Sequence, residues 1–228
     1  MRSERSVSIP GDGGGTFTSA ARRAQFVAAA IETIAEVGYA QATLARIAAR
    51  VGVSKGVICY HFAGKDELVR EVIADIGARG GAFVYAQALT LPTAAERLRG
   101  WIASILEYTA AHRTETVAFH EIAAGSRGDA AVSAVMTELS ASVASAVQAL
   151  FADGQASGEF RADFDAQAAT TALMAILDAV PPRMARDPDF DVARYGREVA
   201  GLFDAATRRP APPETGARTT SPGKGGRQ

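Results

Sequence analysis

Apolar residues recur every three to four positions along most of this chain, which is the period of one face of an α-helix. The first such segment, residues 19–37, carries one apolar stripe formed by Phe26, Ala30, Ile34 and Val37. Alanine is frequent, and runs of Val, Ile and Thr long enough for a strand are few. The pattern therefore predicts an all-α protein with about nine helices.

The same period predicts later helices at about 65–89, 93–112, 115–124, 129–156, 165–180 and 192–207. Within the first of these, Gly77, Gly80 and Gly81 each cost roughly 1 kcal/mol relative to alanine, and they indicate either close helix packing or a bend. The pair at 181–182 is Pro-Pro, which must end or kink the helix before it.

Two short helices separated by a glycine are predicted between residues 43 and 62. Thr43 is a good N-cap for the first, and Gly52 ends it, because glycine enters the left-handed conformation without a steric penalty. Ser54 is the predicted cap of a second helix that begins at Lys55. Helix, tight turn and helix form the helix-turn-helix pattern, whose second helix lies in the major groove of DNA.

The second of these helices has two different faces. Ile58 and Phe62 are four residues apart and share a face that we expect to be buried. The opposite face is expected to meet DNA through Lys55, Gly56, Cys59 and Tyr60. For Cys59 an apolar base contact is favoured over redox sensing, because one nearby lysine is weak support for a lowered thiol pKa.

Charge and composition agree with this assignment. The whole chain has a formal net charge of −1, but residues 18–70 hold seven cations and four anions, so their balance is 7 − 4 = +3. A basic module on an acidic remainder fits DNA contact by one part of the protein. The single cysteine excludes an internal disulfide and fits a reducing cytoplasm.

Several classes of function are not expected. The N-terminal residues contain no apolar core of a signal peptide, and no apolar run approaches the roughly 18 residues that span a bilayer. His61, His112 and His120 lack the spacing of metal ligands, so we predict no metal and no cofactor. Without a nucleophile–base pairing or a phosphate-binding loop, the chain is not expected to be an enzyme.

The run at residues 51–68, VGVSKGVICYHFAGKDEL, resembles the DNA-binding domain of TetR-type transcriptional repressors, which commonly reads VSxGxLYxHFxxKxxL. The triplet YHF at residues 60–62, followed by Lys65 and Leu68, makes the match specific. Cys59 departs from the family, which usually carries tyrosine there. The segment at residues 154–165 is also common in this family ahead of its last two helices.

This resemblance implies an organisation and a DNA-contacting surface. It implies a helix-turn-helix domain at 18–64 and a ligand-binding and dimerisation domain at 65–208, while the low apolar content of the two ends predicts a disordered arm at 1–17 and a disordered tail at 209–228. Phosphate or base contacts are implied for Thr43, Ser54, Lys55, Gly56, Cys59, Tyr60, His61 and Lys65. Helix capping is the alternative role for Thr43 and Ser54, and core packing is the alternative for His61.

The second domain is expected to hold an effector pocket and a dimer surface. The candidate pocket residues, each of which is equally suited to core packing, are Phe83, Trp101, Ile105, Tyr108, Phe119, His120, Met136 and Met174. The candidate dimer residues on the last two long helices are Ala168, Ala172, Leu173, Ile176, Val199, Leu202 and Phe203.

The function implied is that of a cytoplasmic, homodimeric repressor that binds a palindromic DNA operator and is released by a small apolar or aromatic effector. A DNA-binding regulator without such an effector, sensing a protein or nothing, and an activator remain the alternatives. A pocket-free second domain would distinguish the regulator without an effector.

Overall fold

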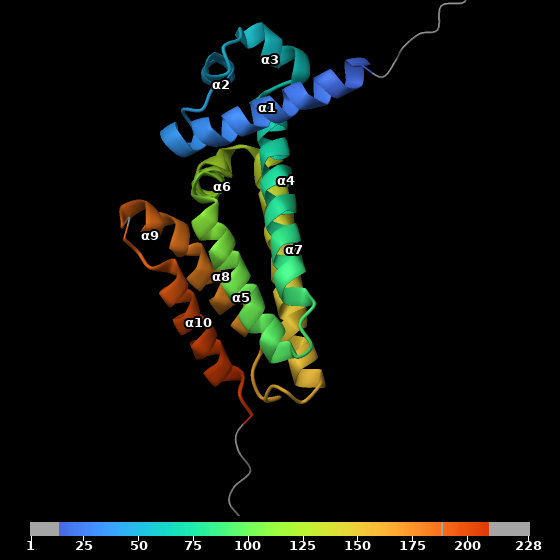
Figure 1. Ribbon diagram of the computed structural model, residues 1–228, viewed down its shortest axis with the longest axis vertical. Helices are drawn as coiled ribbons and strands as arrows, with labels where there is room; N and C mark the ends of the chain where they lie inside the picture. The colour runs from blue at the N-terminus through green and yellow to red at the C-terminus, as the bar shows by residue number, and fades with distance from the viewer. Residues whose placement is uncertain (1–13, 188, 210–228) are drawn as a thin grey trace, which may run out of the picture.

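The computed structural model describes residues 14–187 and 189–209, and these residues are almost entirely helical (Figure 1). The elements are α1 (Gly14–Val37), α2 (Leu44–Arg50), α3 (Lys55–His61), α4 (Lys65–Val84), α5 (Ala94–Ala111), α6 (Arg113–Gly125), α7 (Ala130–Ala156), α8 (Ala166–Asp178), α9 (Val180–Arg186) and α10 (Val192–Thr207). A π-helical turn, η1 (Tyr85–Leu89), extends α4, and a 3-10 turn, η2 (Ser126–Gly128), precedes α7. The predicted all-α class is confirmed.

Two bodies of helices meet end to end in Figure 1. The helices α1, α2 and α3 form a small domain at one end, and α1 lies across the top of a bundle whose helices run lengthwise. The N-terminal domain is not a separate core, because buried residues of α6 and α7, such as Ile122 and Val132, join its hydrophobic cluster. A second cluster, which includes Leu98, Phe151 and Leu173, fills the rest of the bundle.

Most of the predicted helix N-caps are present in the structure. Thr93 caps α5 in a capping box with Glu96, and the side chains of Asp129 and Asp165 cap α7 and α8. Ser54 occupies the N-cap position of α3, but its side chain makes no capping hydrogen bond, so that predicted role is wrong in part.

The Pro-Pro pair starts a helix that the sequence did not predict. The helix α8 ends at Asp178, and Pro181 and Pro182 lie in the first turn of α9. Proline is tolerated there because the first N–H groups of a helix have no partner within it.

The helix α4 continues through its glycines, and close packing explains one of them. A Cβ at Gly77 would lie 3.1 Å from Leu139 Cδ2 of α7, so the absence of a side chain lets the two helices approach. Gly81 has no neighbour within 4 Å of its ideal Cβ position. The glycines therefore serve helix packing at Gly77, and no bend is needed to explain them.

The chain termini differ from the expectation where they are described. The helix α1 begins at Gly14, so residues 14–17 of the predicted arm are helical. The rest of the predicted arm, residues 1–13, and residues 210–228 of the predicted tail lie outside the described residues.

The helix α7 is more apolar than the sequence reading recognised. It has 27 residues with a window of mean hydropathy 1.4, which by length and composition is enough to cross a membrane. Only 17% of this window is buried, and its exposed positions are mainly alanine and serine. A single such helix is weak evidence for a membrane span, and α7 packs against α4, α5 and α8 within the bundle.

Candidate nucleic-acid interface

The recognition helix α3 is held by its apolar side. Ile58 and Phe62 are 0% and 1% exposed, and Ile47 of α2 packs into the same cluster at 0% exposure. Between the two helices, Gly52 adopts a φ of +72°, which supplies the tight turn. The orientation of α3 is therefore fixed by buried side chains on one face, which leaves the other face free to meet a partner.

The exposed face of α3 carries the residues predicted to meet DNA. Lys55, Gly56 and Cys59 are exposed, and Tyr60 is 85% exposed. An aromatic side chain this exposed contributes almost nothing to the core, so its position favours a surface that binds a partner. The structure brings these four residues together on one side of a short helix, and their contacts with DNA remain a prediction.

The remaining predicted contacts are divided between structural and exposed roles. Thr43 is exposed, and its hydroxyl accepts a hydrogen bond from the Arg46 backbone N–H at 3.3 Å, which confirms its capping role. His61 is half-buried, and its ring lies 5.6 Å from the Phe26 ring and 5.2 Å from the Tyr60 ring, measured between centroids. His61 thus packs against the domain, as its alternative assignment proposed.

Lys65 points into the protein in this structure. Its ammonium group donates a hydrogen bond to the Tyr39 carbonyl and lies 3.9 Å from the centroid of the Tyr39 ring. Burial lowers the pKa of Lys65, with the opposing charge of Asp129 as a smaller effect. The predicted phosphate contact of Lys65 would require this side chain to leave its intramolecular partners.

Tyr39 connects the DNA-binding domain to the bundle. Its side chain is 8% exposed, and its hydroxyl donates a hydrogen bond to Asp129 Oδ2 at 3.0 Å, at the N-terminus of α7. Burial, and then this hydrogen bond, raise the pKa of Tyr39 to about 12. Gly125 lies against the ring, because a Cβ there would be 2.9 Å from Tyr39 Cβ. The predicted structural role of Tyr39 is confirmed, but its partners lie too far along the chain for the sequence pattern to show.

We expect Tyr39→Phe to lower the free energy of unfolding by about 1–2 kcal/mol, because the half-buried Asp129 carboxylate loses a charge-assisted hydrogen bond from the buried Tyr39 hydroxyl. Urea unfolding at one protein concentration measures this change. Tyr60→Phe removes a hydroxyl from an 85% exposed residue and should leave stability unchanged. Equal stability of the wild type and Tyr39→Phe would contradict a stabilising connection between Tyr39 and Asp129.

A second link, also missed by the sequence analysis, fixes the end of the recognition helix. The guanidinium of Arg23 in α1 donates to the His61 carbonyl and lies 4.1 Å from the centroid of the Phe62 ring. It also pairs with Glu71 and, at 3.1 Å, with Glu67, both in α4. Arg23 therefore ties α1, α3 and α4 together instead of adding to the positive surface.

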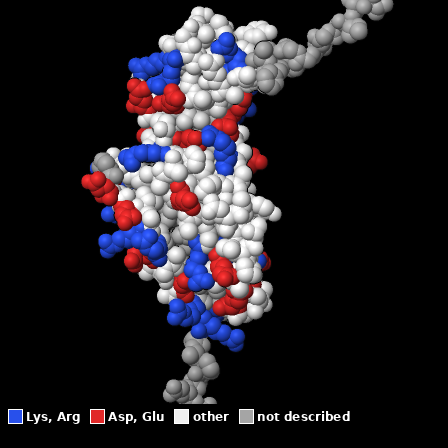
Figure 2. Space-filling view, viewed as in Figure 1, with Lys and Arg blue, Asp and Glu red and all other residues white. Residues whose placement is uncertain are grey.

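The basic character of the domain is smaller at the surface than the count of charges suggests. Arg50 pairs with Glu36 and, at 3.1 Å, with Glu32, and Arg23 and Lys65 have the intramolecular partners described above. Figure 2 shows Lys and Arg side chains near the α2 end of the molecule with Asp and Glu side chains directly beside them. Positive charge for DNA is left mainly to the exposed side chains of Lys55, Arg46 and Arg22.

The eight residues predicted to line an effector pocket do not meet in one place. Phe119 and Met136 pack in the cluster shared with the DNA-binding domain, whereas Trp101, Ile105 and Met174 pack in the second cluster. The helical pattern identified them as apolar and inward-facing, but it could not show that the interior is divided in two.

The other candidate pocket residues have partners of their own. The rings of Phe83 and Tyr108 lie 5.6 Å apart, and the Tyr108 hydroxyl donates to Glu115 Oε2 at 2.8 Å. His120 is half-buried on α6. Two grooves, of about 780 and 350 Å³, are lined by none of the eight predicted residues and border α1 instead.

The predicted dimer residues fall into a buried group and a group that is exposed or half-buried. Leu173, Val199 and Phe203 are 0%, 2% and 7% exposed and pack in the second cluster, so their side chains are not available to a partner. Their assignment to an interface is corrected to the protomer core. By contrast, Ala168 and Ala172 are exposed, and Leu202 is 63% exposed. Ile176 is half-buried on α8.

Comparisons with known proteins match both parts of this architecture. Residues 26–72 match the family described as bacterial regulatory proteins of the tetR family. Residues 94–207, half of the chain, match the C-terminal domain of BetI-type transcriptional repressors. The regulator BetI 1 of Chromohalobacter salexigens is 50% identical over 60 residues, which are 25% of this chain and 30% of that protein. The alignment thus spans less than a third of this relative.

Solved structures share the fold over most of the chain. A transcriptional regulator from Saccharomonospora viridis in complex with choline has a TM-score of 0.71 at 22% identity, covering 82% of this chain and 96% of that one. The regulator FadR from Bacillus subtilis in complex with stearoyl-CoA has a TM-score of 0.68 at 21% identity, covering 79% and 96%. At these identities the structures show the fold alone.

The family matches cover the helix-turn-helix and the helical domain behind it, and the families they describe are regulators, not enzymes. The chain therefore belongs to the TetR family of bacterial transcriptional regulators.

Proposed function

We propose that this protein is a cytoplasmic homodimeric repressor that binds a palindromic operator and is released from it by a small-molecule effector. The observation that carries the proposal is the exposed face of α3, where Tyr60 is 85% exposed beside Lys55 while Ile58 on the opposite face is fully buried. A helix anchored in this way can enter a major groove without disturbing the core.

The dimer follows from the size of this surface. One seven-residue recognition helix reads too few base pairs for a specific site, and two copies related by a two-fold axis read a palindrome. The exposed residues Ala168 and Ala172 of α8 and Leu202 of α10 are suited to the contact, because small side chains let helices approach closely. The Tyr195 hydroxyl of α10 donates a hydrogen bond to the Ile176 carbonyl of α8 at 3.5 Å, so the two helices touch at this point.

The effector is supported by the similar structures that hold choline in one case and stearoyl-CoA in another. The alternative, a regulator without an effector in its C-terminal domain, is favoured by the dispersal of the eight expected pocket residues over two packed clusters. A direct test distinguishes these two candidate functions, since only a regulator with an effector changes its operator affinity when a small molecule is added.

The DNA-binding function is tested by titrating the protein against the DNA upstream of its own gene at several salt concentrations. We expect the double variant Lys55→Ala/Tyr60→Ala to lose roughly 100-fold in affinity and to lower the salt dependence, because it removes a cation and an aromatic contact. Tyr85→Ala, which removes a tyrosine 62% exposed on η1, should bind like the wild type. Equal binding by the wild type and the double variant, with helicity and oligomeric state retained, would refute the proposed interface.

A further inference from the structure

The exposed face of α3 carries an apolar side chain, Val57, that is not among the predicted DNA contacts. Val57 is 38% exposed and lies next to Gly56 in the first turn of the helix. Residues three or four apart lie on one side of a helix, so Val57 and Gly56 share a face with Tyr60, while Ile58 is fully buried on the opposite side. A single exposed valine is ordinary on a protein surface, but this one lies on the face proposed to enter the major groove.

The side chains of α3 have little capacity to read bases by hydrogen bonds. Adenine is read by Asn or Gln and cytosine by Asp or Glu, and residues 55–61, KGVICYH, contain none of these. Lys55 is exposed and suits guanine or a phosphate. The Tyr60 hydroxyl both donates and accepts, so it does not distinguish the bases by itself. The base that remains is thymine, because its C5-methyl group takes apolar contacts.

Gly56 has no role in the fold that requires a glycine. The nearest atom to an added Cβ would be Ser54 Oγ, at the ordinary contact distance of 3.7 Å, and the φ of Gly56 is not positive. Glycine also weakens a helix relative to alanine. Neither packing nor backbone conformation therefore explains the missing side chain, whereas close approach of the α3 backbone to a partner does.

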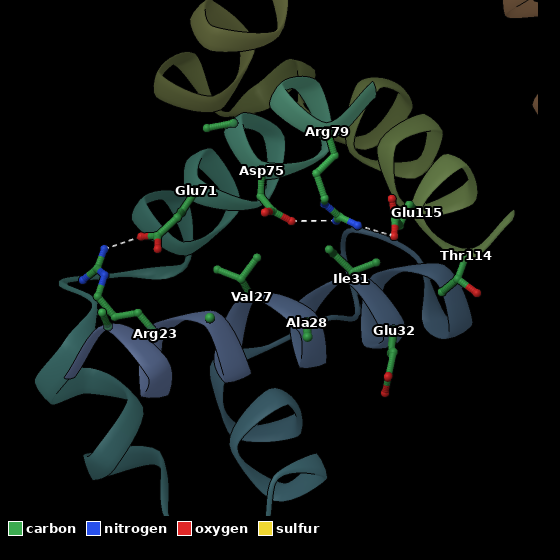
Figure 3. Close-up of a pocket in the computed structure, with 13 residues that line it drawn as sticks. Arg23, Val27, Ala28, Ile31, Glu32, Glu71, Asp75, Arg79, Thr114 and Glu115 are labelled. Atoms are coloured by element: carbon green, nitrogen blue, oxygen red, sulfur yellow. Dashed lines mark hydrogen bonds and ion pairs between the residues drawn. The ribbon is translucent and has the colours of Figure 1, made fainter. Parts of the chain in front are cut away.

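The helix is held in a fixed orientation, which a short side chain needs if it is to meet one particular group of a partner. The guanidinium of Arg23 in α1 donates to the His61 carbonyl at the end of α3 and pairs with Glu71 of α4 (Figure 3). Figure 1 shows α3 at the outer end of the N-terminal domain, with α1 between it and the bundle. Val57 thus lies on a helix whose inner side is anchored and whose outer side is exposed.

From these features we propose that Val57 reads the C5-methyl group of a thymine in each half-site of the operator. This inference rests on the proposed function and adds the base that α3 recognises. The valine side chain is short, so its methyl groups reach a base edge only when the helix backbone lies deep in the groove, which Gly56 permits. The contact removes apolar surface of both partners from water, which favours thymine over a base without the methyl group.

The test uses the operator delimited by footprinting on the DNA upstream of the gene, with each thymine replaced in turn, in both half-sites, by deoxyuridine. Deoxyuridine keeps the base pair and its hydrogen-bonding groups and removes only the methyl group. At one position per half-site the wild type should lose about fourfold in affinity for each methyl group, or about 16-fold for the symmetric pair, as expected for one buried apolar carbon. A wild type that binds every substituted operator as tightly as the parent operator would overturn the inference.

Three variants assign the methyl contact to a residue. Val57→Ala should bind the thymine and deoxyuridine operators with equal affinity, because its side chain no longer reaches the methyl group. Val57→Thr keeps one of the two side-chain methyl groups and should retain part of the discrimination. Cys59→Ala is the matched control, since Cys59 is also a small exposed residue of α3, and it should discriminate like the wild type. Discrimination that is lost in Cys59→Ala and kept in Val57→Ala would overturn the assignment to Val57.

Gly56→Ala tests the close approach of the helix separately from folding. Its Tm should be no lower than that of the wild type, because alanine is the better helix former and the added Cβ has room. Its operator affinity should fall at least about fivefold, the low end of the effect of overpacking a close contact. Operator binding as tight as that of the wild type would show that α3 does not lie deep enough for Val57 to reach a base.

Sequence-specific binding separates this inference from the proposed function. If the wild type prefers its operator to random DNA and the Lys55→Ala/Tyr60→Ala protein does not, but no thymine methyl group affects binding, only the inference is wrong. If the wild type binds its operator no more tightly than random DNA, the proposed function and the inference are both wrong.

Discussion

Gly154→Ala is expected to lower the free energy of unfolding by about 3 kcal/mol or more, the upper end of the range for overpacked cores. Gly154 is buried on α7, and an added Cβ would lie 2.8 Å from Cγ of Phe160 and closer still to two other atoms of that ring. Among 150–250-residue proteins, a change of this size lowers Tm by about 10 °C.

The Phe160 ring has little freedom to move away. Its residue is 4% exposed, its backbone N–H donates to the Gly154 carbonyl at 2.9 Å, and its ring centroid lies 6.4 Å from that of Phe151. The antiparallel bridge between Phe160 and Arg208 further holds this segment against the end of α10.

The control is Gly81→Ala in α4, where nothing lies within 4 Å of the ideal Cβ position. That substitution should stabilise the protein by up to about 1 kcal/mol, because alanine is the better helix former. Thermal and urea unfolding at one protein concentration measure both variants. A Gly154→Ala protein as stable as the wild type would show that Phe160 does not pack against α7 as described.

Leu202→Glu is expected to convert the proposed dimer to monomers and to lower operator affinity on the order of 100-fold, because a monomer holds only one half-site. Leu202 is 63% exposed on α10, so the substitution leaves the protomer core intact. In the proposed interface the added carboxylate would be buried without a partner, which opposes association.

Tyr85→Glu is the matched control, since Tyr85 is 62% exposed but lies on η1 and not on α8 or α10. Analytical ultracentrifugation gives the oligomeric state, and the same operator titration gives the affinity. A Leu202→Glu protein that stays dimeric, or a Tyr85→Glu protein that dissociates, would place the dimer contact on a different face.

Local chemistry explains why the sequence by itself determined most of the helices and which face of α3 is exposed. The turn at Gly52 and the cap at Thr43 depend on residues within a few positions of each other. The four-residue spacing of Ile58 and Phe62 likewise predicts which side of α3 is buried and which side exposes Tyr60. Secondary structure and the sidedness of a single helix can therefore be predicted from sequence alone.

The tertiary structure decided which residues from distant helices meet. Tyr39 and Asp129 are 90 positions apart, and the Arg23 pair with Glu71 spans 48. No short-range pattern contains such pairs, because they depend on the crossing of helices packed around two clusters.

The same reason explains the errors in the bundle. The helices that carry Leu173 and Leu202 both have apolar residues, and only packing shows that Leu173 enters the protomer core while Leu202 faces outward. Periodicity tells which residues of one helix share a face, but the neighbour that covers that face is set by the arrangement of the whole bundle.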